Sequence, residues 1–174
     1  MEKPSSMNSI NGTVQRRLNG LADTARLAHQ IAPRLGRGDA ILLTGPLGAG
    51  KSTFARALIR ALTQADEEVP SPTFTLVQTY VTSTGLELSH FDLYRLSDPE
   101  EVVELGFEEA LDSGAVLVEW PQRLGTALPR DRLDIEFSVI GSPGLAVADD
   151  EPRLATLSAH GTWIWRLSEL MRDL

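Results

Sequence analysis

The segment "GPLGAGKSTF", which begins at Gly45, combines three glycines with the only lysine of the chain beyond position 3. Gly45, Gly50, Lys51 and Ser52 satisfy the pattern G-x-x-x-x-G-K-[ST], in which successive backbone N–H groups of a tight turn surround phosphate oxygens. A side chain at Gly48 or Gly50 would obstruct that approach. The pattern predicts that Lys51 reaches the β- and γ-phosphates of a nucleotide and that the Ser52 hydroxyl binds Mg²⁺.

The residues on both sides of this turn provide the context that the pattern requires. The apolar run "DAILLTG", from Asp39 to Gly45, is typical of a strand buried on both faces. The following "KSTFARALIRAL" places Phe54, Leu58 and Leu62 on one face of a helix. A helix that begins at the turn directs its positive end at a bound anion. The order of strand, glycine turn and helix therefore favours phosphate binding over a turn that serves packing alone.

A phosphate-binding loop needs acidic residues to complete a metal site, usually at the end of a neighbouring strand. Asp92 ends the run "LELSHFD" and Glu119 ends the run "AVLVE", so both are expected to face the nucleotide. One acid is expected to hold the metal, directly or through water, and the other to orient the attacking water. Their spacing does not assign the two roles.

Four further residues have both a functional and a structural interpretation. The hydroxyl of Thr73, in "SPTFT", is placed to close on the γ-phosphate and metal as in nucleotide-gated switch loops, or else belongs to a proline turn that enters a strand. His90 is a catalytic candidate or a hydrogen-bonded sheet residue. Arg95 is a charge-stabilising residue or the partner of a nearby acid. Trp120 packs beside the nucleotide or fills the core.

The remaining patterns predict the elements that position these residues. Residues 21–35 and 162–174 have helical periodicity, with Asn19 as the cap of the first helix, and "SDPEEVVELG" predicts a short helix that ends at Gly106. Strands are predicted for a hairpin of residues 73–81 and 86–94, and for residues 115–120, 132–140 and 153–161. These elements indicate an α/β protein, a P-loop NTPase-like three-layer sandwich with a mixed parallel and antiparallel central sheet.

Composition narrows the class of protein. The 174 residues include 23% charged and 42% hydrophobic residues, as in globular proteins, and no apolar run reaches the roughly 20 residues that span a bilayer. Residues 1–18 are predicted to be a disordered leader without a secretory signal, and residues 19–174 a single domain. The absence of cysteine fits a cytoplasmic protein, and no membrane partner is expected. A net charge of -8 with dispersed arginines disfavours unaided binding of nucleic acid.

Four motifs in the same order, "GPLGAGKSTF", "SPTFTLVQTY", "HFDLYRL" and "VLVEWPQRL", resemble the TsaE family, formerly called YjeE. Its members are small bacterial P-loop ATPases required for the threonylcarbamoyladenosine (t(6)A) modification of tRNA. The resemblance covers about residues 21 to 133, and four ordered motifs make it highly specific. It implies that residues 19–174 form a P-loop ATPase domain.

The resemblance also implies roles for individual residues and a set of partners. Asp92 is expected to be needed for hydrolysis, Ser52 and Glu119 are expected to bind Mg²⁺, and Thr73 becomes a stronger switch candidate. Family members associate with the TsaD–TsaB complex, which modifies the tRNA, so tRNA is expected to be an indirect partner only. The expected ATP-binding residues are Gly45, Gly48, Ala49, Gly50, Lys51, Ser52 and Thr53.

The resemblance implies a Mg²⁺-dependent ATPase, slow alone, whose hydrolysis resets the TsaD–TsaB complex between turnovers. Two alternatives remain open at the level of sequence. One is a nucleotide-gated adaptor in which ATP binding alone orders the Thr73 segment for a partner. The other is a P-loop small-molecule kinase, although the sequence has no obvious arginine-bearing lid to shield phosphoryl transfer from water.

Overall fold

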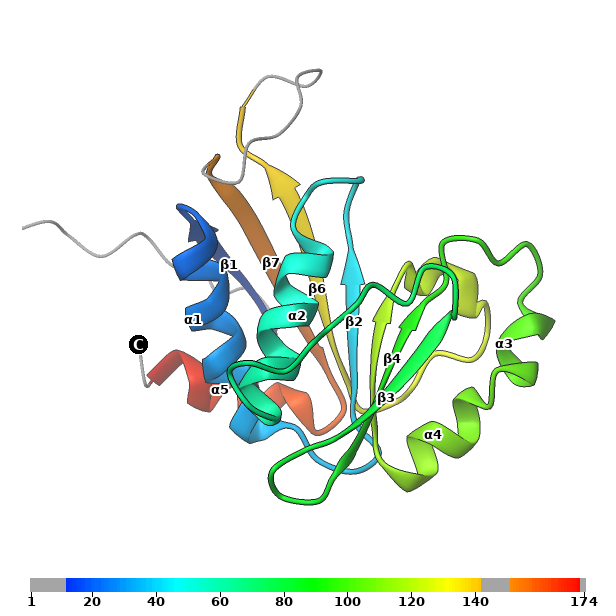
Figure 1. Cartoon of the computed structure of the whole chain (residues 1–174). Coiled ribbons are helices and arrows are strands. Elements are labelled where there is room, and N and C mark those ends of the chain that lie inside the picture. The colour runs from blue at the N-terminus through cyan, green and yellow to red at the C-terminus, as the bar shows by residue number, and fades with distance from the viewer. Residues whose placement is uncertain (1–11, 142–150, 173–174) are drawn as a thin grey trace, which may run out of the picture.

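The computed structural model describes residues 12–141 and 151–172, which are organised around one seven-stranded sheet (Figure 1). The strands follow the spatial order β1-β7-β6-β2-β5-β4-β3. The neighbouring pairs β6–β2, β2–β5 and β5–β4 are parallel, whereas β1 and β3 at the edges and β7 pair antiparallel. The sheet is therefore mixed, as predicted. The strands are β1 (Thr13–Leu18), β2 (Ala40–Thr44), β3 (Val77–Val81), β4 (Glu87–Asp92), β5 (Ala115–Glu119), β6 (Arg132–Val139) and β7 (Arg153–His160).

Helices lie on both faces of the sheet and give the predicted three layers (Figure 1). One face carries α1 (Leu21–Ile31), α2 (Lys51–Leu62) and α5 (Trp163–Arg172), and the other carries α3 (Glu100–Glu104) and α4 (Phe107–Ser113). Two short 3₁₀ turns, η1 (Ala32–Arg34) and η2 (Pro121–Leu124), join elements. Among these described helices, none combines the length and apolar character needed to cross a bilayer.

The alternation of side chains along β2 explains why both faces need a helical layer. Ile41 and Leu43 pack into the apolar cluster beneath α1, α2 and α5, whereas Ala40 and Leu42 pack into the cluster beneath α3 and α4. All four side chains are buried, with at most 2% exposure. A strand that is apolar on both faces is stable only in the middle of a sandwich. The glycine turn that follows β2 therefore lies at the carboxyl end of a central strand.

The second face is apolar only where α3 and α4 cover β4 and β5. On β6 the residues that point away from α1 and α2 are polar: Arg132 and Asp134 are partly exposed and Glu136 is exposed. Thr156 and Ser158 of β7 continue this polar face. One half of the sheet thus has the one-sided pattern of an antiparallel sheet that faces water.

The prediction that residues 1–18 form a disordered leader is wrong for residues 13–18. Residues 1–11 lie outside the described residues, but Thr13–Leu18 forms β1, antiparallel to β7. Val14 and Leu18 are buried and belong to the cluster beneath α1. Asn19 is also not the cap of α1, because Gly20 occupies that position and the Asn19 backbone N–H donates to the Asp23 carboxylate over 3.0 Å.

Two further boundaries differ from the prediction. The strand expected from residue 73 begins only at Val77, because residues 72–76 form a turn in which the Leu76 N–H donates to the Pro72 carbonyl. The short helix predicted to end at Gly106 ends at Glu104, with Leu105 as its C-cap. Gly106 is instead the N-cap of α4, a helix that the sequence analysis did not identify. The strands predicted around β2, β4, β5, β6 and β7 and the terminal helix are confirmed, with ends shifted by one or a few residues.

The junction between α4 and β5 gives a test of this packing. A Cβ atom at Gly114 would lie 2.1 Å from the Glu87 carbonyl oxygen, which is a backbone atom that cannot move aside alone. We expect Gly114→Ala to lower the free energy of unfolding by about 1–3 kcal/mol or more, measured by urea titration. Gly36→Ala is the control, because its Cβ would lie an ordinary 3.5 Å from the nearest atom. Equal urea midpoints for the two variants would contradict the prediction.

Candidate active site

The glycine turn links the end of β2 to the start of α2. Gly45, Gly48 and Gly50 have φ angles of 135°, 79° and 111°, which residues with side chains rarely adopt. A Cβ at Gly45 would also lie 2.4 Å from the carbonyl oxygen of Phe137 on β6. The turn is therefore built on glycine for two reasons, its backbone angles and its close contact with the neighbouring strand.

Lys51, the first residue of α2, has only 4% of its surface exposed. Its ammonium donates to the Gly45 carbonyl over 2.6 Å and to the Pro46 carbonyl over 2.9 Å, and it lies 4.2 Å from the centre of the Trp120 ring. Burial lowers the pKa of Lys51, an effect that the negative charges of Glu119 and Asp92 oppose. These contacts hold one cation at the mouth of the turn.

The two predicted acids lie side by side at the carboxyl ends of adjacent parallel strands. Asp92 ends β4 and Glu119 ends β5, and the two residues are partners in the strand register. Glu119 is also in register with Leu43 of β2, so it lies next to the strand that leads into the turn. The Ser52 hydroxyl donates to Glu119 Oε2 over 2.8 Å. The sheet thus brings together the lysine, the hydroxyl and both carboxylates that the sequence singles out.

Glu119 is 2% exposed, and its other oxygen lies 3.0 Å from Nε2 of the equally buried His90. Burial raises the pKa of Glu119, but the hydrogen bond and charge of His90, the Ser52 hydroxyl and the charge of Lys51 together outweigh it and lower that pKa. His90 is therefore part of the site. Its Nδ1 is buried without a hydrogen-bond partner among residues 12–141 and 151–172.

Thr73 contacts the second acid. Its hydroxyl donates to Asp92 Oδ2 over 3.1 Å and lies 2.6 Å from the Ser71 hydroxyl. The Tyr94 N–H donates to Asp92 Oδ1 over 3.1 Å, so both carboxylate oxygens accept a hydrogen bond. The segment after the proline turn is thereby tied to the end of β4, as its interpretation as a switch requires.

Backbone strain is concentrated around the two acids. Leu76 and Trp120 are the two described residues other than glycine with positive φ, 65° and 62°. Trp120 directly follows Glu119, and the Leu76 carbonyl accepts the Asp92 N–H over 3.0 Å. Strained backbone of this kind persists only where the surroundings fix it, and it is common at functional sites.

The two remaining aromatic and cationic candidates lie at the rim. Trp120 contacts Lys51 and lies 4.9 Å from the ring of Tyr94, so it packs beside the turn. The Arg95 guanidinium lies 4.7 Å from the centre of the Phe74 ring, which is 83% exposed. Trp120 therefore belongs to the site, and Arg95 stacks on the segment next to it.

The turn, both acids, Thr73 and Trp120 line a cavity of about 340 Å³. Ala49 and Gly45 do not line it, since the Ala49 side chain is buried in the core and Gly45 packs against β6. Sequence reasoning missed Tyr94 and Arg153, although "HFDLYRL" contains the first. Arg153 follows no motif, and only the position of β7 brings it to the turn. The lining residues are Leu47, Gly48, Gly50, Lys51, Ser52, Thr53, Ser71, Thr73, Asp92, Tyr94, Glu119, Trp120 and Arg153.

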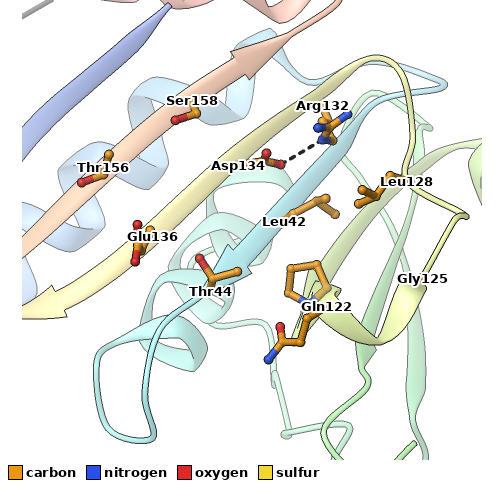
Figure 2. A pocket seen from close by; sticks show the side chains of 11 residues that line it. Leu42, Thr44, Gln122, Gly125, Leu128, Arg132, Asp134, Glu136, Thr156 and Ser158 are labelled. Carbon is orange, nitrogen blue, oxygen red and sulfur yellow. Dashed lines mark hydrogen bonds and ion pairs between the residues drawn. The ribbon is translucent and has the colours of Figure 1, made fainter. Parts of the chain in front are cut away.

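A second cavity, of about 390 Å³, lies on the polar half of the sheet (Figure 2). Figure 2 shows hydroxyl and carboxylate side chains of β6 and β7 on one open face, bordered by Leu128 and Gln122. Asp134 accepts a hydrogen bond from Arg132 over 3.2 Å and lies 3.0 Å from His160. The polar groups of this second cavity are thus partly paired with one another. The predicted site residues Ser52, Asp92 and Glu119 all line the first cavity instead.

A strand, a turn of the pattern G-x-x-x-x-G-K-S and a helix at the carboxyl edge of a mixed sheet define a P-loop α/β protein. A family model described as "Threonylcarbamoyl adenosine biosynthesis protein TsaE" matches residues 18–142 of the chain. The chain belongs to this family, as the four motifs of the sequence indicate.

Relatives and a solved structure agree with this assignment. A Rickettsia felis protein is 42% identical over 145 residues, which cover 83% of this chain and 80% of the relative. A Bacillus subtilis protein is 35% identical over 140 residues, or 80% and 81% of the two chains. Both are named tRNA threonylcarbamoyladenosine biosynthesis protein TsaE. The crystal structure of Bacillus subtilis YdiB matches with a TM-score of 0.73 and 28% identity, covering 95% of this chain and 99% of YdiB.

The lowered pKa of Glu119 predicts a pH dependence of stability. Its carboxylate contributes stability that is present above the pKa of the unfolded chain and is lost as the pH falls through the lower pKa of the folded state. We expect the free energy of unfolding of the wild type, minus that of Glu119→Gln, to decrease as the pH falls across this window. Urea titrations at stepped pH measure it, with Glu87→Gln, exposed at the start of β4, as control. A difference that stays constant or grows toward acid pH would refute the prediction.

Proposed function

We propose that this protein is an ATP-binding and ATP-hydrolysing subunit that acts through the TsaD–TsaB complex in the t(6)A modification of tRNA. The observation that carries the proposal is the convergence of Lys51, Ser52, Asp92 and Glu119 on one cavity at the carboxyl edge of the sheet. Membership of the TsaE family supports the pathway. The cavity supports the reaction, because it joins a phosphate-binding turn to two carboxylates.

The turn supplies the phosphate site. Its backbone N–H groups and the positive end of α2 attract the anion, and the glycines leave room for close approach. Lys51 already lies at the mouth of the turn, where it donates to the carbonyls of Gly45 and Pro46. The ammonium exchanges these neutral acceptors for β- and γ-phosphate oxygens, a stronger charge-assisted interaction.

The residues beside the turn fit Mg²⁺, which prefers oxygen ligands and usually takes one or two carboxylates together with phosphates and water. Ser52 Oγ and Glu119 Oε2 lie 2.8 Å apart and would hold the ion, with Asp92 as a further ligand directly or through water. When bound, Mg²⁺ neutralises charge on the phosphates. His90 keeps the Glu119 carboxylate in place through the 3.0 Å contact with its other oxygen.

Asp92 is suited to orient the attacking water. Asp92 is 6% exposed and lines the cavity, and its two carboxylate oxygens are positioned by the Thr73 hydroxyl and the Tyr94 N–H. Glu119 is thus the main metal ligand, because it is the acid bonded to Ser52. Asp92 mainly orients the attacking water. Thr73 then connects the state of the nucleotide to the segment of residues 71–76.

The charge of the chain favours an indirect role with RNA. Binding to a phosphate backbone is driven by counterion release at many basic contacts, and a net charge of -8 disfavours such contacts. The partner complex therefore holds the tRNA. The protein then acts in the cytoplasm and resets the complex between turnovers. A nucleotide-gated adaptor is the second candidate, favoured by the hydrogen bond from Thr73 to Asp92, which couples a loop to the site without any need for hydrolysis.

Removing the ammonium of Lys51 tests the phosphate site. We expect Lys51→Ala to weaken ATP binding by at least tenfold, or roughly 1.4 kcal/mol, because hydrogen bonds to charged groups contribute about this much or more. Titration calorimetry of the purified protein measures the affinity. Arg56→Ala, which removes a cation from the same helix outside the cavity lining, is the control and should bind as the wild type does. Unchanged affinity in Lys51→Ala would refute the phosphate site.

Removing either acid tests hydrolysis and coupling. We expect Asp92→Ala and Glu119→Ala to fold and bind ATP but to lower steady-state turnover at least 100-fold, alone and with purified TsaD–TsaB complex. The wild type and the control Glu87→Ala should be stimulated by the complex. The measurement is phosphate release, with ATP affinity and thermal unfolding followed in parallel.

The outcomes separate the candidate functions. Stimulation that is lost in Glu119→Ala supports a partner-coupled ATPase. Retained t(6)A formation with a variant that binds ATP without hydrolysing it would favour the adaptor. A small molecule that raises turnover and becomes phosphorylated would indicate a kinase. Normal turnover in both acid variants would exclude the two-carboxylate site.

A further inference from the structure

The outer edge of β3 is open for pairing. β3 is the last strand of the sheet, and among residues 12–141 and 151–172 no strand pairs with its outer edge. Just beyond the strand, the Thr82 N–H donates to the Leu86 carbonyl across the hairpin over 2.8 Å. Because backbone groups alternate in direction along a strand, those of Thr79 and Val81 point to the outer edge. Such an edge presents N–H and C=O groups with which another chain can pair.

A cavity of about 360 Å³ follows this edge. Four consecutive residues of β3, from Gln78 to Val81, line it. Successive side chains of a strand point to opposite faces of the sheet, so a cavity that touches all four runs along the strand edge and not over one face. Val81 is 65% exposed, and it adds an apolar side chain to the outward-pointing backbone.

The other part of the lining is acidic. Glu67 and Glu68 belong to an acidic loop, residues 66–68, that follows α2, and both line the cavity. Neither carboxylate has a hydrogen bond or ion pair with another residue that the structure describes, since Arg60 donates to the backbone carbonyl of Glu67 over 3.1 Å. Thr63, the C-cap of α2, also lines the cavity, where the helix end adds partial negative charge. The cavity therefore attracts a cation.

Tyr80 gives an independent indication of a ligand. It lines the same cavity, is 7% exposed, and its hydroxyl is buried without a hydrogen-bond partner within the described part of the chain. Burial and the negative charge of Glu67 both raise the pKa of Tyr80, which places its ring close to the acidic loop. Buried tyrosine hydroxyls normally have a partner, so this one is expected to gain its partner from a bound group.

Charge distinguishes between two possible occupants of the edge. A second copy of the chain, paired β3 to β3, would bring two acidic loops together, and like charges facing each other across an interface are strongly unfavourable. A strand with basic side chains would instead place opposite charges against Glu67 and Glu68. The electrostatics of the cavity therefore favour a basic segment of a different protein.

We propose that the outer edge of β3 and the acidic loop form a docking site for a partner protein, which adds an extended segment to the sheet and places a lysine or arginine against Glu67 and Glu68. In this mode of recognition main-chain hydrogen bonds provide affinity and side-chain pockets provide specificity. β3 directly follows residues 71–76, which Thr73 ties to Asp92, so the docked segment lies next to the segment that contacts the candidate active site. The docking site itself requires no nucleotide.

Peptide binding to the full-length protein tests the acidic part of the site. The probe is a short, capped, fluorescein-labelled peptide that alternates valine with lysine, and fluorescence anisotropy measures its affinity. We expect a double variant, Glu67→Gln with Glu68→Gln, to bind it about tenfold more weakly, because two charge-assisted hydrogen bonds are lost. Asp66→Asn removes the neighbouring charge outside the cavity lining and is the matched control, which should bind as the wild type does.

A second comparison separates strand addition from attraction between charges alone. The same peptide with every backbone amide N-methylated keeps its charge but cannot pair with an edge, so we expect its affinity to fall about tenfold or more. Val81→Pro removes an outward N–H and should weaken the unmodified peptide similarly, with Val81→Thr as control. Thermal unfolding verifies that each variant folds, and the methylated peptide carries this comparison if Val81→Pro does not fold.

Each outcome bears on the proposal. Equal affinities of the double variant and Asp66→Asn would overturn the role of the acidic loop, and equal affinities of the two peptides would overturn strand addition. A wild type that binds neither peptide overturns the whole docking site. Self-association that is lost in Val81→Pro, measured by analytical ultracentrifugation, would assign the edge to a second copy of the chain and overturn the proposal as well.

Discussion

A buried carboxylate at the end of a central strand is costly unless its neighbours compensate it, and Glu119 imposes this constraint on the site. With 2% exposure, it relies on His90 from β4, Ser52 from α2 and the charge of Lys51. The backbone continues the connection, because the Leu93 N–H donates to the Glu119 carbonyl over 3.1 Å. One negative charge thus fixes the mutual positions of β4, β5 and α2.

The second acid connects this rigid centre to a more exposed segment. Asp92 accepts hydrogen bonds from Thr73 and from the backbone at Tyr94, and its own N–H is bonded to the strained Leu76. Phe74, within the same segment, is 83% exposed. A change at the Asp92 carboxylate therefore has a short covalent and hydrogen-bonded route to the protein surface, as the proposed coupling to a partner requires.

The elements with the fewest recognisable motifs also support the site. β7 delivers Arg153 to the turn, β6 supplies the Phe137 carbonyl that excludes a side chain at Gly45, and β1 completes the sheet beside β7. The sequence analysis did not predict the β1 strand, whose segment "TVQRRL" has two apolar residues, Val14 and Leu18, separated by three polar ones. Its stability comes from pairing with β7 and from burial of Val14 and Leu18, which are long-range interactions.

The sequence by itself determined the features that depend on short spacing. The turn pattern, the helix after it and the placement of Asp92 and Glu119 at strand ends follow from local sterics and side-chain periodicity, which residues within one segment encode. The tertiary structure alone decided that Glu119 bonds to Ser52 and His90, that Thr73 bonds to Asp92 and that Arg153 lines the cavity. These contacts join segments up to 105 residues apart, and they arise from strand order, which no local pattern specifies.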